Sequence, residues 1–423
     1  MLSIQDLRSD SSHIIEKLKK RGLDVQSSVE EILALDAESR GIRTELERVQ
    51  SESNQAASKI GQLMREGKKE EAESIKAKTS EWKQEIKSLQ AELDEKEGRL
   101  QAAILTLPNT PHDTVPAGKS AEDNKEVLLH GVKPVLPDNA LPHWELAKKY
   151  DIIDFDLGVK VSGAGFPVYK GKGAILQRAL IQFFLNEAGK AGYTEIQAPL
   201  LVNESSGYGT GQLPDKEGQM YHVGMDDLYL IPTAEVPITN MFRDEMLKED
   251  QLPIKSCGYT PCFRREAGSY GAHVRGLNRL HQFDKVEIVQ IVHPDTSYDV
   301  LEDMSSYVQS LLQKLGLHYR VLLLCGGDMG FTSAKTYDME VWSPAQEMWL
   351  ECSSVSNFEN FQTRRLRCRF KGTDKKAQLA HSLNGSALAL PRIVAAILES
   401  NQTADGIMVP EVLQPYTGFS MID

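Results

Sequence analysis

Two matched stretches of heptad repeats near the N-terminus most constrain how this chain can fold. Apolar residues recur at alternating steps of three and four from Ile32 to Leu63, and the pattern resumes from Ala72 to Ala103. This spacing indicates helices packed as a coiled coil. A polar break containing Gly67 separates two seams of equal length, which favours one chain folding back over a long parallel dimer rod. We therefore expect an antiparallel helical hairpin.

The predicted hairpin is long but not basic. A helix of roughly 35 residues spans about 50 Å at 1.5 Å per residue, so the hairpin can reach a distant partner. Residues 29–101 contain 13 Lys and Arg against 17 Asp and Glu, a net charge of −4, and the whole chain of 423 residues carries −12. This negative charge excludes a protein whose whole surface is basic and binds nucleic acid. Any RNA must therefore bind to local basic patches.

The chain divides into three segments. Residues 1–105 hold a short helical element and the hairpin. Residues 106–120 contain three prolines, which end the second helix and predict a linker. From 121 to 423, short β-rich runs such as 285–292 alternate with helical patterns such as 174–188, so we expect an α+β domain.

Several classes of protein are excluded by what the sequence lacks. We expect a cytoplasmic protein that does not cross a membrane, because there is no long apolar run and no secretory signal. Five cysteines, an odd number in a chain of this size, predict reduced thiols, and no second ligand pair accompanies Cys257 and Cys262 to form a zinc site. The glycines at 163–165 and 171–173 do not match a dinucleotide fingerprint and predict turns.

The most informative segment is residues 262–287. It begins with Arg-Arg-Glu at 264–266, continues into a Gly-rich basic loop and ends in an alternating strand, 283–292. We interpret it as a β-hairpin that could bind a nucleotide, because arginine binds phosphate oxygens in pairs and an aromatic ring can stack on a base. A solvated charged hairpin is the alternative. The loop and tip carry Gly268, Gly271, Arg275 and Arg279.

This segment resembles motif 2 of class II aminoacyl-tRNA synthetases. Over its full length, its sequence is similar to that of the seryl-tRNA synthetase family. Residues 195–199 resemble motif 1, whose proline lies at the dimer interface in that class, and residues 384–392 resemble motif 3. The resemblance covers nearly the whole chain, and it continues through residues 209–214, 232–237, 327–330, 334–342 and 351–357. Ala387 and Pro391 depart from it, because family members often have Gly at these positions.

The resemblance implies a homodimer whose catalytic domain is an antiparallel β-sheet flanked by helices. It implies that L-serine and ATP give seryl-adenylate and pyrophosphate, with Mg²⁺ present, and that the seryl group passes to the 3′ end of tRNA-Ser, or of tRNA-Sec where that exists. In that family the hairpin grips the long variable arm of tRNA-Ser. Neither step needs a protein nucleophile, so the protein positions groups and stabilises charge. A synthetase-like ligase that charges a carrier protein and a non-catalytic coiled-coil paralogue remain alternatives.

The resemblance also implies individual roles. Arg264 and Arg392 are the implied catalytic residues: Arg264 bridges the α-phosphate and the serine carboxylate, and Arg392 binds the far end of the triphosphate. The implied ATP-binding residues are Arg264, Arg265, Glu266, Arg279, Phe283, Glu351, Cys352, Ser353, Ser354 and Arg392, of which Glu351 and Ser354 bind Mg²⁺. The implied serine-binding residues are Thr233, Ala234, Glu235, Arg264, Glu287 and Ser386. The implied tRNA-binding residues are Arg40, Arg43, Arg48 and Arg275.

Overall fold

A computed structural model describes residues 1–215, 218–266 and 275–423. The chain forms two compact units, the first made of residues 1–19 and 23–108 and the second of residues 20–22 and 109–423. Gly268 and Gly271 of the predicted basic loop lie outside the described residues. No helix in the described part is long and apolar enough to span a membrane.

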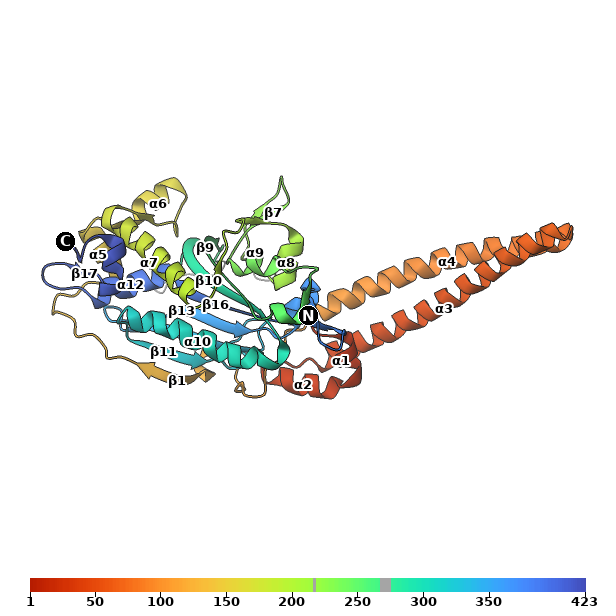
Figure 1. Cartoon of the computed structure of the whole chain (residues 1–423), viewed down its shortest axis with the longest axis horizontal. Helices are drawn as coiled ribbons and strands as arrows, with labels where there is room; N and C mark the ends of the chain where they lie inside the picture. Colours follow the sequence, from red (N-terminus) through yellow and green to blue (C-terminus); the bar gives the residue numbers. More distant parts are fainter. Residues whose placement is uncertain (216–217, 267–274) are drawn as a thin grey trace. The chain divides into compact units, whose positions relative to one another are not determined.

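The first unit contains the predicted antiparallel helical hairpin, which is confirmed. Its two long helices run side by side (Figure 1) and are joined by a turn in which Gly67 has a φ of +78°, a left-handed conformation that glycine adopts readily. The helices of this unit are α1 (Ile4–Ser9), α2 (Ser11–Lys19), α3 (Gln26–Arg65) and α4 (Lys69–Ile104).

The seam between α3 and α4 follows the heptad pattern. Seam residues such as Ile32, Leu46 and Leu93 are buried. Lys96 is a charged residue at a seam position of α4, and its ammonium lies 2.7 Å from the carboxylate of Glu38 on α3. At the root of the hairpin an apolar cluster joins the short helices to the ends of the long ones; its buried members are Leu7, Ile14, Ile15, Leu18, Val25, Val29, Ile32, Ile104 and Leu107.

The second unit is built on an eight-stranded sheet, which confirms the predicted α+β class. Within the described residues, neighbouring strands of this sheet are antiparallel, except that β4 is parallel to β9. In sheet order the strands are β1 (Lys125–His130), β11 (Tyr319–Leu323), β12 (Lys335–Ser343), β13 (Met348–Asn357), β16 (His381–Ala389), β10 (Gln282–Val292), β9 (Ile254–Phe263) and β4 (Thr194–Glu195).

Helices cover the sheet, and the main apolar core lies between one face and the long helices α7, α10 and α12 (Figure 1). The helices of this unit are α5 (His143–Lys149), α6 (Phe155–Val161), α7 (Gly171–Lys190), α8 (Glu204–Thr210), α9 (Glu235–Asn240), α10 (Ser297–Lys314), α11 (Phe361–Leu366), α12 (Leu390–Ser400) and α13 (Gln414–Thr417). Two small sheets have two strands each: β2 (Ile153–Asp154) pairs with β3 (Val168–Tyr169), and β17 (Ile407–Met408) pairs with β18 (Met421–Ile422). In a three-stranded sheet, β14 (Arg369–Lys371) lies between β15 (Ala377–Leu379) and β8 (Met246–Lys248). In another, β7 (Leu228–Leu230) lies between β5 (Leu201–Val202) and β6 (His222–Val223).

Strand β10 differs from the alternating strand that the sequence predicts. It is buried continuously from Lys285 to Val292, because β9 and β16 flank it and both of its faces are covered. Val286 and Ile288 belong to the main core, whereas Val289 packs with α9 in a separate cluster. A central strand covered on both faces shows no exposed polar side.

The glycines at 171–173 were wrongly predicted to form a turn. They form the first turn of α7. A Cβ atom at Gly173 would lie 2.2 Å from the carbonyl oxygen of Ile152, so glycine here permits a close approach of two backbone segments.

Candidate active site

A cavity of about 550 Å³ in the second unit gathers most of the residues that the sequence singles out. Strands β9 and β10 pair as the predicted hairpin legs, and β13, β16 and the start of α12 complete the walls. The predicted residues that line this cavity are Thr233, Glu235, Arg264, Glu266, Arg279, Phe283, Glu287, Glu351, Cys352, Ser353, Ser354, Ser386 and Arg392.

One wall is formed by alternate residues of β10. Phe283, Lys285 and Glu287 line the cavity together, because residues two apart on a strand share a face. Arg264 follows β9, and its guanidinium carbon lies 5.1 Å from the centre of the Phe283 ring. The Nε of Arg264 also donates a hydrogen bond to the carbonyl oxygen of Pro232 at 3.3 Å. The guanidinium is thus fixed beside the aromatic ring.

A buried polar network lies deeper on the same strand. Glu287 is 2% exposed and accepts a hydrogen bond from the Thr233 hydroxyl at 3.2 Å. The ammonium of Lys285 pairs with the Glu287 carboxylate and donates to the Thr233 hydroxyl at 2.8 Å. Ser386 lies directly opposite Glu287 in the pairing of β16 with β10. The cavity thus contains a buried carboxylate among hydroxyl groups and one cation.

Glu235 brings a second buried carboxylate to this end of the cavity. Its Oε1 accepts a hydrogen bond from the Gln362 amide at 2.7 Å. Burial, the largest cause, and the nearby Glu287 together raise the pKa of Glu235 to about 7, while Gln362, Lys285 and Arg264 oppose this rise. A cationic ligand would favour its ionised form.

The other end of the cavity carries exposed charge. Arg392, in the first turn of α12, donates hydrogen bonds to the carbonyl oxygens of Glu351 and Asn278, and its Nη1 lies 3.8 Å from the Glu351 carboxylate. Ser354 donates to Asp338 on the neighbouring strand β12. Burial and then the Glu351 charge raise the pKa of Asp338 well above its usual range. The carboxylates at this end therefore repel one another.

Near the hairpin, Glu266 accepts a hydrogen bond from Arg279 at 2.9 Å, so these two predicted residues form an ion pair. Arg275 lines an adjoining cavity of about 1320 Å³, where its guanidinium carbon lies 4.6 Å from the centre of the Trp144 ring. Glu266 and Arg279 line both cavities. The two cavities are therefore neighbours.

Two of the residues predicted to bind ATP or serine do not line the cavity. Ala234 is fully buried and packs with Ile238 and Val289. Arg265 is exposed, with its guanidinium carbon 5.9 Å from the centre of the Tyr221 ring.

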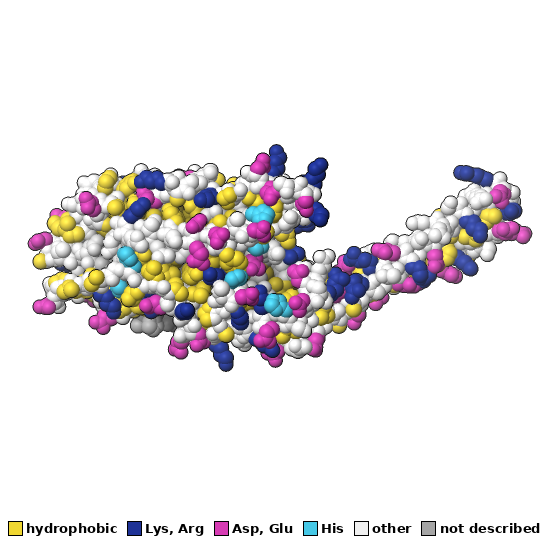
Figure 2. Space-filling view, turned by 60° about the horizontal axis from the view of Figure 1, so that its bottom comes forward, with side chains coloured by type: hydrophobic (Ala, Val, Ile, Leu, Met, Phe, Trp, Pro, Cys, Tyr) yellow, Lys and Arg dark blue, Asp and Glu magenta, His cyan; other side chains and the backbone are white. Residues whose placement is uncertain are grey.

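Three of the four arginines predicted to contact tRNA lie on α3, and each pairs with a carboxylate. Arg40 contacts Asp36 at 3.0 Å, Arg43 contacts Glu97 on α4, and Arg48 contacts both Glu45 and Glu52 at 2.5 Å. Basic and acidic side chains are interleaved along the helical hairpin in Figure 2, so the hairpin presents no single basic patch in that view.

Comparison with known proteins identifies the family. A model described as the seryl-tRNA synthetase N-terminal domain matches residues 1–111, and one described as the tRNA synthetase class II core domain (G, H, P, S and T) matches residues 221–401. A serine--tRNA ligase from Salinibacter ruber is 53% identical, over 100% of this chain and 99% of its own. The chain belongs to the seryl-tRNA synthetase family. This confirms the family resemblance of the sequence motifs.

Solved structures of the seryl-tRNA synthetase family have the same fold. The enzyme from Pyrococcus horikoshii, complexed with ATP, is 35% identical with a TM-score of 0.92. The cytoplasmic enzyme from Naegleria fowleri, in complex with AMP, is 26% identical with a TM-score of 0.87. Each match covers 100% of this chain and 99% of the other. The likeness therefore extends over both units.

In this member of the seryl-tRNA synthetase family, the sequence reasoning missed Lys285 and Gln362. Lys285 could have been found, because it lies two residues from both Phe283 and Glu287 on a predicted strand. Gln362 carries no such signal, since it approaches Glu235 from α11, far away in the sequence.

Proposed function

We propose that this chain activates L-serine with ATP and transfers the seryl group to the 3′ end of tRNA-Ser, and to tRNA-Sec where that tRNA exists. The observation that carries this function is a single cavity that combines a guanidinium beside an aromatic ring with a buried network of carboxylate and hydroxyl groups. The first part suits a nucleotide phosphate and its base, and the second suits a small amino acid with a hydroxyl group. Because tRNA charging serves translation, we propose a cytoplasmic location.

In the activation step, the serine carboxylate attacks the α-phosphate and pyrophosphate leaves. Arg264 bridges the two reacting groups and stabilises the charge that develops between them. Arg392 binds the far end of the triphosphate, and Phe283 and Glu266 bind adenine by stacking and by hydrogen bonding. In the transfer step, a ribose hydroxyl at the tRNA 3′ end attacks the seryl carbonyl and AMP leaves. The protein positions the reactants in both steps.

Mg²⁺ fits the charge-rich end of the cavity. Glu351 and Ser354 would hold it, and a divalent cation would relieve the repulsion by Glu351 that, after burial, raises the pKa of Asp338. The ion needs few protein ligands because it keeps several waters and binds phosphate oxygens. When bound, it neutralises phosphate charge. Within the described ranges, no group of three or more His, Cys, Asp or Glu side chains is arranged to hold a metal.

The serine-binding end predicts how the enzyme rejects alanine. Glu287→Gln should lower the ratio of kcat/KM for serine over alanine about tenfold, because a charge-assisted hydrogen bond to the hydroxyl becomes a neutral one. Adenylate formation with each amino acid measures the ratio. Asp284→Asn is the matched control, since this carboxylate on the same strand bonds to Tyr259 and Gln177 instead. An unchanged ratio in Glu287→Gln would show that another group recognises the hydroxyl of the substrate serine.

Glu235 predicts a pH dependence. Since its pKa lies near 7, the carboxylate is mostly ionised above pH 7 and accepts the serine ammonium, whereas below pH 7 it is mostly protonated and must lose a proton first. We expect kcat/KM for serine to fall about tenfold per pH unit as pH drops below 7. Glu235→Gln should lower kcat/KM at pH 8 and remove this inflection. An inflection of the same size in the variant would assign it to another group.

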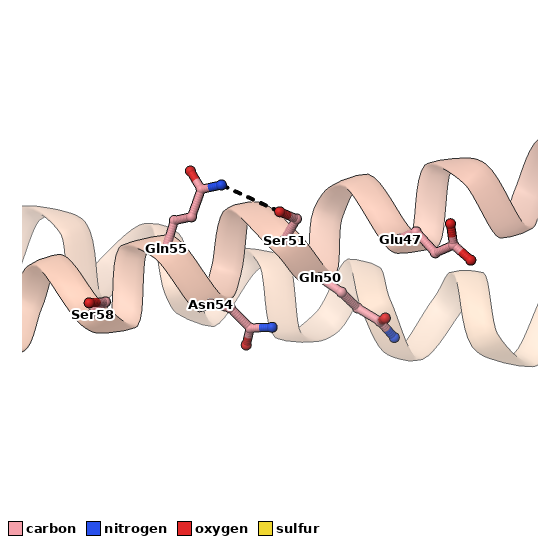
Figure 3. A pocket seen from close by; sticks show the side chains of 6 residues that line it. All are labelled: Glu47, Gln50, Ser51, Asn54, Gln55 and Ser58. Carbon is pink, nitrogen blue, oxygen red and sulfur yellow. Dashed lines mark hydrogen bonds between the residues drawn. The ribbon is translucent and has the colours of Figure 1, made fainter.

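We propose that residues 1–105 form a tRNA-binding domain, that 106–120 link it, and that 121–423 form the catalytic domain. Arg40, Arg43, Arg48 and Arg275 remain proposed tRNA contacts. Support for RNA binding by the hairpin comes also from a polar surface of α3 (Figure 3), where amide and hydroxyl groups can bond to ribose and phosphate oxygens. This surface consists of Glu47, Gln50, Ser51, Asn54, Gln55 and Ser58.

A homodimer is proposed from the motif 1 resemblance. Strand β4 lies at the end of the large sheet, and Pro199, Leu200 and Leu201, which follow it in the sequence, are exposed. An exposed apolar segment at a sheet edge suits pairing with a second copy. Sedimentation at the mass of a single chain would contradict this proposal.

The decisive test of function uses two assays. Serine-dependent exchange of pyrophosphate into ATP separates an enzyme from a non-catalytic paralogue. Charging of a panel that contains tRNA-Ser, tRNA-Sec and a carrier protein then separates a tRNA synthetase from a carrier-charging ligase. Exchange with serine followed by charging of tRNA-Ser is the expected result, and exchange without tRNA charging would contradict it.

A further inference from the structure

Arg21 is a buried arginine that belongs to the second unit although it lies early in the sequence. Its side chain is almost fully enclosed, with 7% of the residue exposed. Burial lowers its pKa to about 10, so the guanidinium remains charged at neutral pH. Burying a cation without hydrogen-bond partners would destabilise the fold, so the acceptors of its N–H groups are informative.

The guanidinium of Arg21 bonds to four backbone carbonyl oxygens. Nε donates to Asn109 at 2.9 Å, and Nη1 donates to Met329 at 3.0 Å. Nη2 donates to Gly330 at 3.2 Å and to Ser333 at 2.6 Å. Three of these acceptors lie in one loop, residues 329–333, between β11 and β12. The planar fork of N–H groups therefore holds one loop at several points at once.

Asn109 strengthens the hold on the same loop. Its side-chain amide donates to the carbonyl oxygens of Thr332 and Phe358, each at 2.9 Å, and its backbone N–H donates to Phe331 at 2.9 Å. Asn109 is also buried. Arg21 and Asn109 together form what we call the loop clamp, which satisfies the carbonyl groups of residues 329–333.

The clamped loop is part of the wall of the active-site cavity. Gly330, Thr332 and Ser333 line it. Thr332 also lies against the end of α8, since a Cβ atom at Gly211 would lie 2.3 Å from its methyl group. Gln362 bonds both to Thr210 in this α8 segment and to Glu235. The loop therefore shapes the end of the cavity that contains Glu235.

We propose that Arg21 is a positioning residue for the activation step, which fixes loop 329–333 and thereby the shape of the serine-binding end of the cavity. This inference rests on the proposed function of that cavity. It assigns to the N-terminal sequence a role in the chemistry of the second unit that is separate from any role of the long hairpin. A displaced wall would affect serine more than ATP, because Arg392 and Glu351 lie at the other end.

The test compares Arg21→Lys and Arg21→Ala with the wild type in the full chain. Lysine keeps the charge but loses the fork of donors. Pyrophosphate exchange at varied serine and varied ATP gives the two KM values, and thermal unfolding reports the fold. We expect the KM for serine to rise about tenfold to 100-fold, since a wall displaced by about 1 Å has effects of that size. The KM for ATP should stay near the wild-type value.

Arg320→Ala is the matched control for a general loss of stability, because Arg320 bonds to Glu340 and Glu126, and none of the three lines the cavity. It should lower the melting temperature without changing either KM. A folded Arg21 variant with the wild-type KM for serine, or with equal increases in both KM values, would overturn the inference. If Arg21→Ala does not fold, Arg21→Lys and Asn109→Ala decide by the same criterion. A wild type without serine-dependent exchange would instead overturn the proposed function, and this inference with it.

Discussion

Arg264→Ala should lower the rate of adenylate formation about 100- to 1,000-fold while the protein remains folded, because removing one preorganised donor from a transition state typically has this effect. The guanidinium is held beside Phe283 and bonded to a single carbonyl oxygen, so its loss removes little packing. Serine-dependent pyrophosphate exchange measures the rate, and circular dichroism reports the fold.

The control for Arg264→Ala is Arg367→Ala. Arg367 pairs with Asp244, lies mostly in solvent and does not line the cavity, so its removal should leave the exchange rate unchanged. Exchange within about tenfold of the wild type in Arg264→Ala would contradict the bridging role of Arg264.

Shortening the hairpin should abolish efficient tRNA charging and spare serine activation. The replacement should cover residues 40–94, because Val29, Ile32 and Ile104 belong to the apolar cluster at the root, and the Lys96–Glu38 pair still joins the two helices there. Loss of about three hydrogen bonds, each contributing about 1 kcal/mol, weakens RNA binding about 100-fold. Pyrophosphate exchange should continue near the wild-type rate.

Charging at sub-saturating tRNA measures this effect, and the exchange assay on the same sample is the internal control. In the intact protein, tRNA affinity should also fall with added salt to the extent that phosphates are contacted. Efficient charging by the shortened chain would show that the arm is a structural or partner-binding element.

The sequence predicts this hairpin well because its signal is local. Each seam position follows from spacing along a single helix, and the turn at Gly67 follows from a break in that spacing. The cavity was predicted mainly through motif resemblance. Periodicity alone explains why Phe283 and Glu287 share a face of β10, and it would also have identified Lys285.

Other parts of the site depend on contacts that no local pattern encodes. Gln362 and Arg21 reach the neighbourhood of the cavity from distant positions, and only the fold brings them there. The error about the glycines at 171–173 has a similar origin, since their role is set by the approach of Ile152. The alternating pattern expected for β10 failed because tertiary packing covers both of its faces.

One face of β10 lines the cavity and the other packs in the core, and this separation bears on how substrate preference could change. Phe283, Lys285 and Glu287 point into the cavity, whereas Val286 and Ile288 lie in the main core. Exchanging Phe283, Lys285 or Glu287 would therefore alter mainly the ligand chemistry of the cavity, whereas exchanging Val286 or Ile288 would alter mainly the packing of the core. A single strand thus offers separate positions for evolving a new amino-acid preference and for tuning heat resistance.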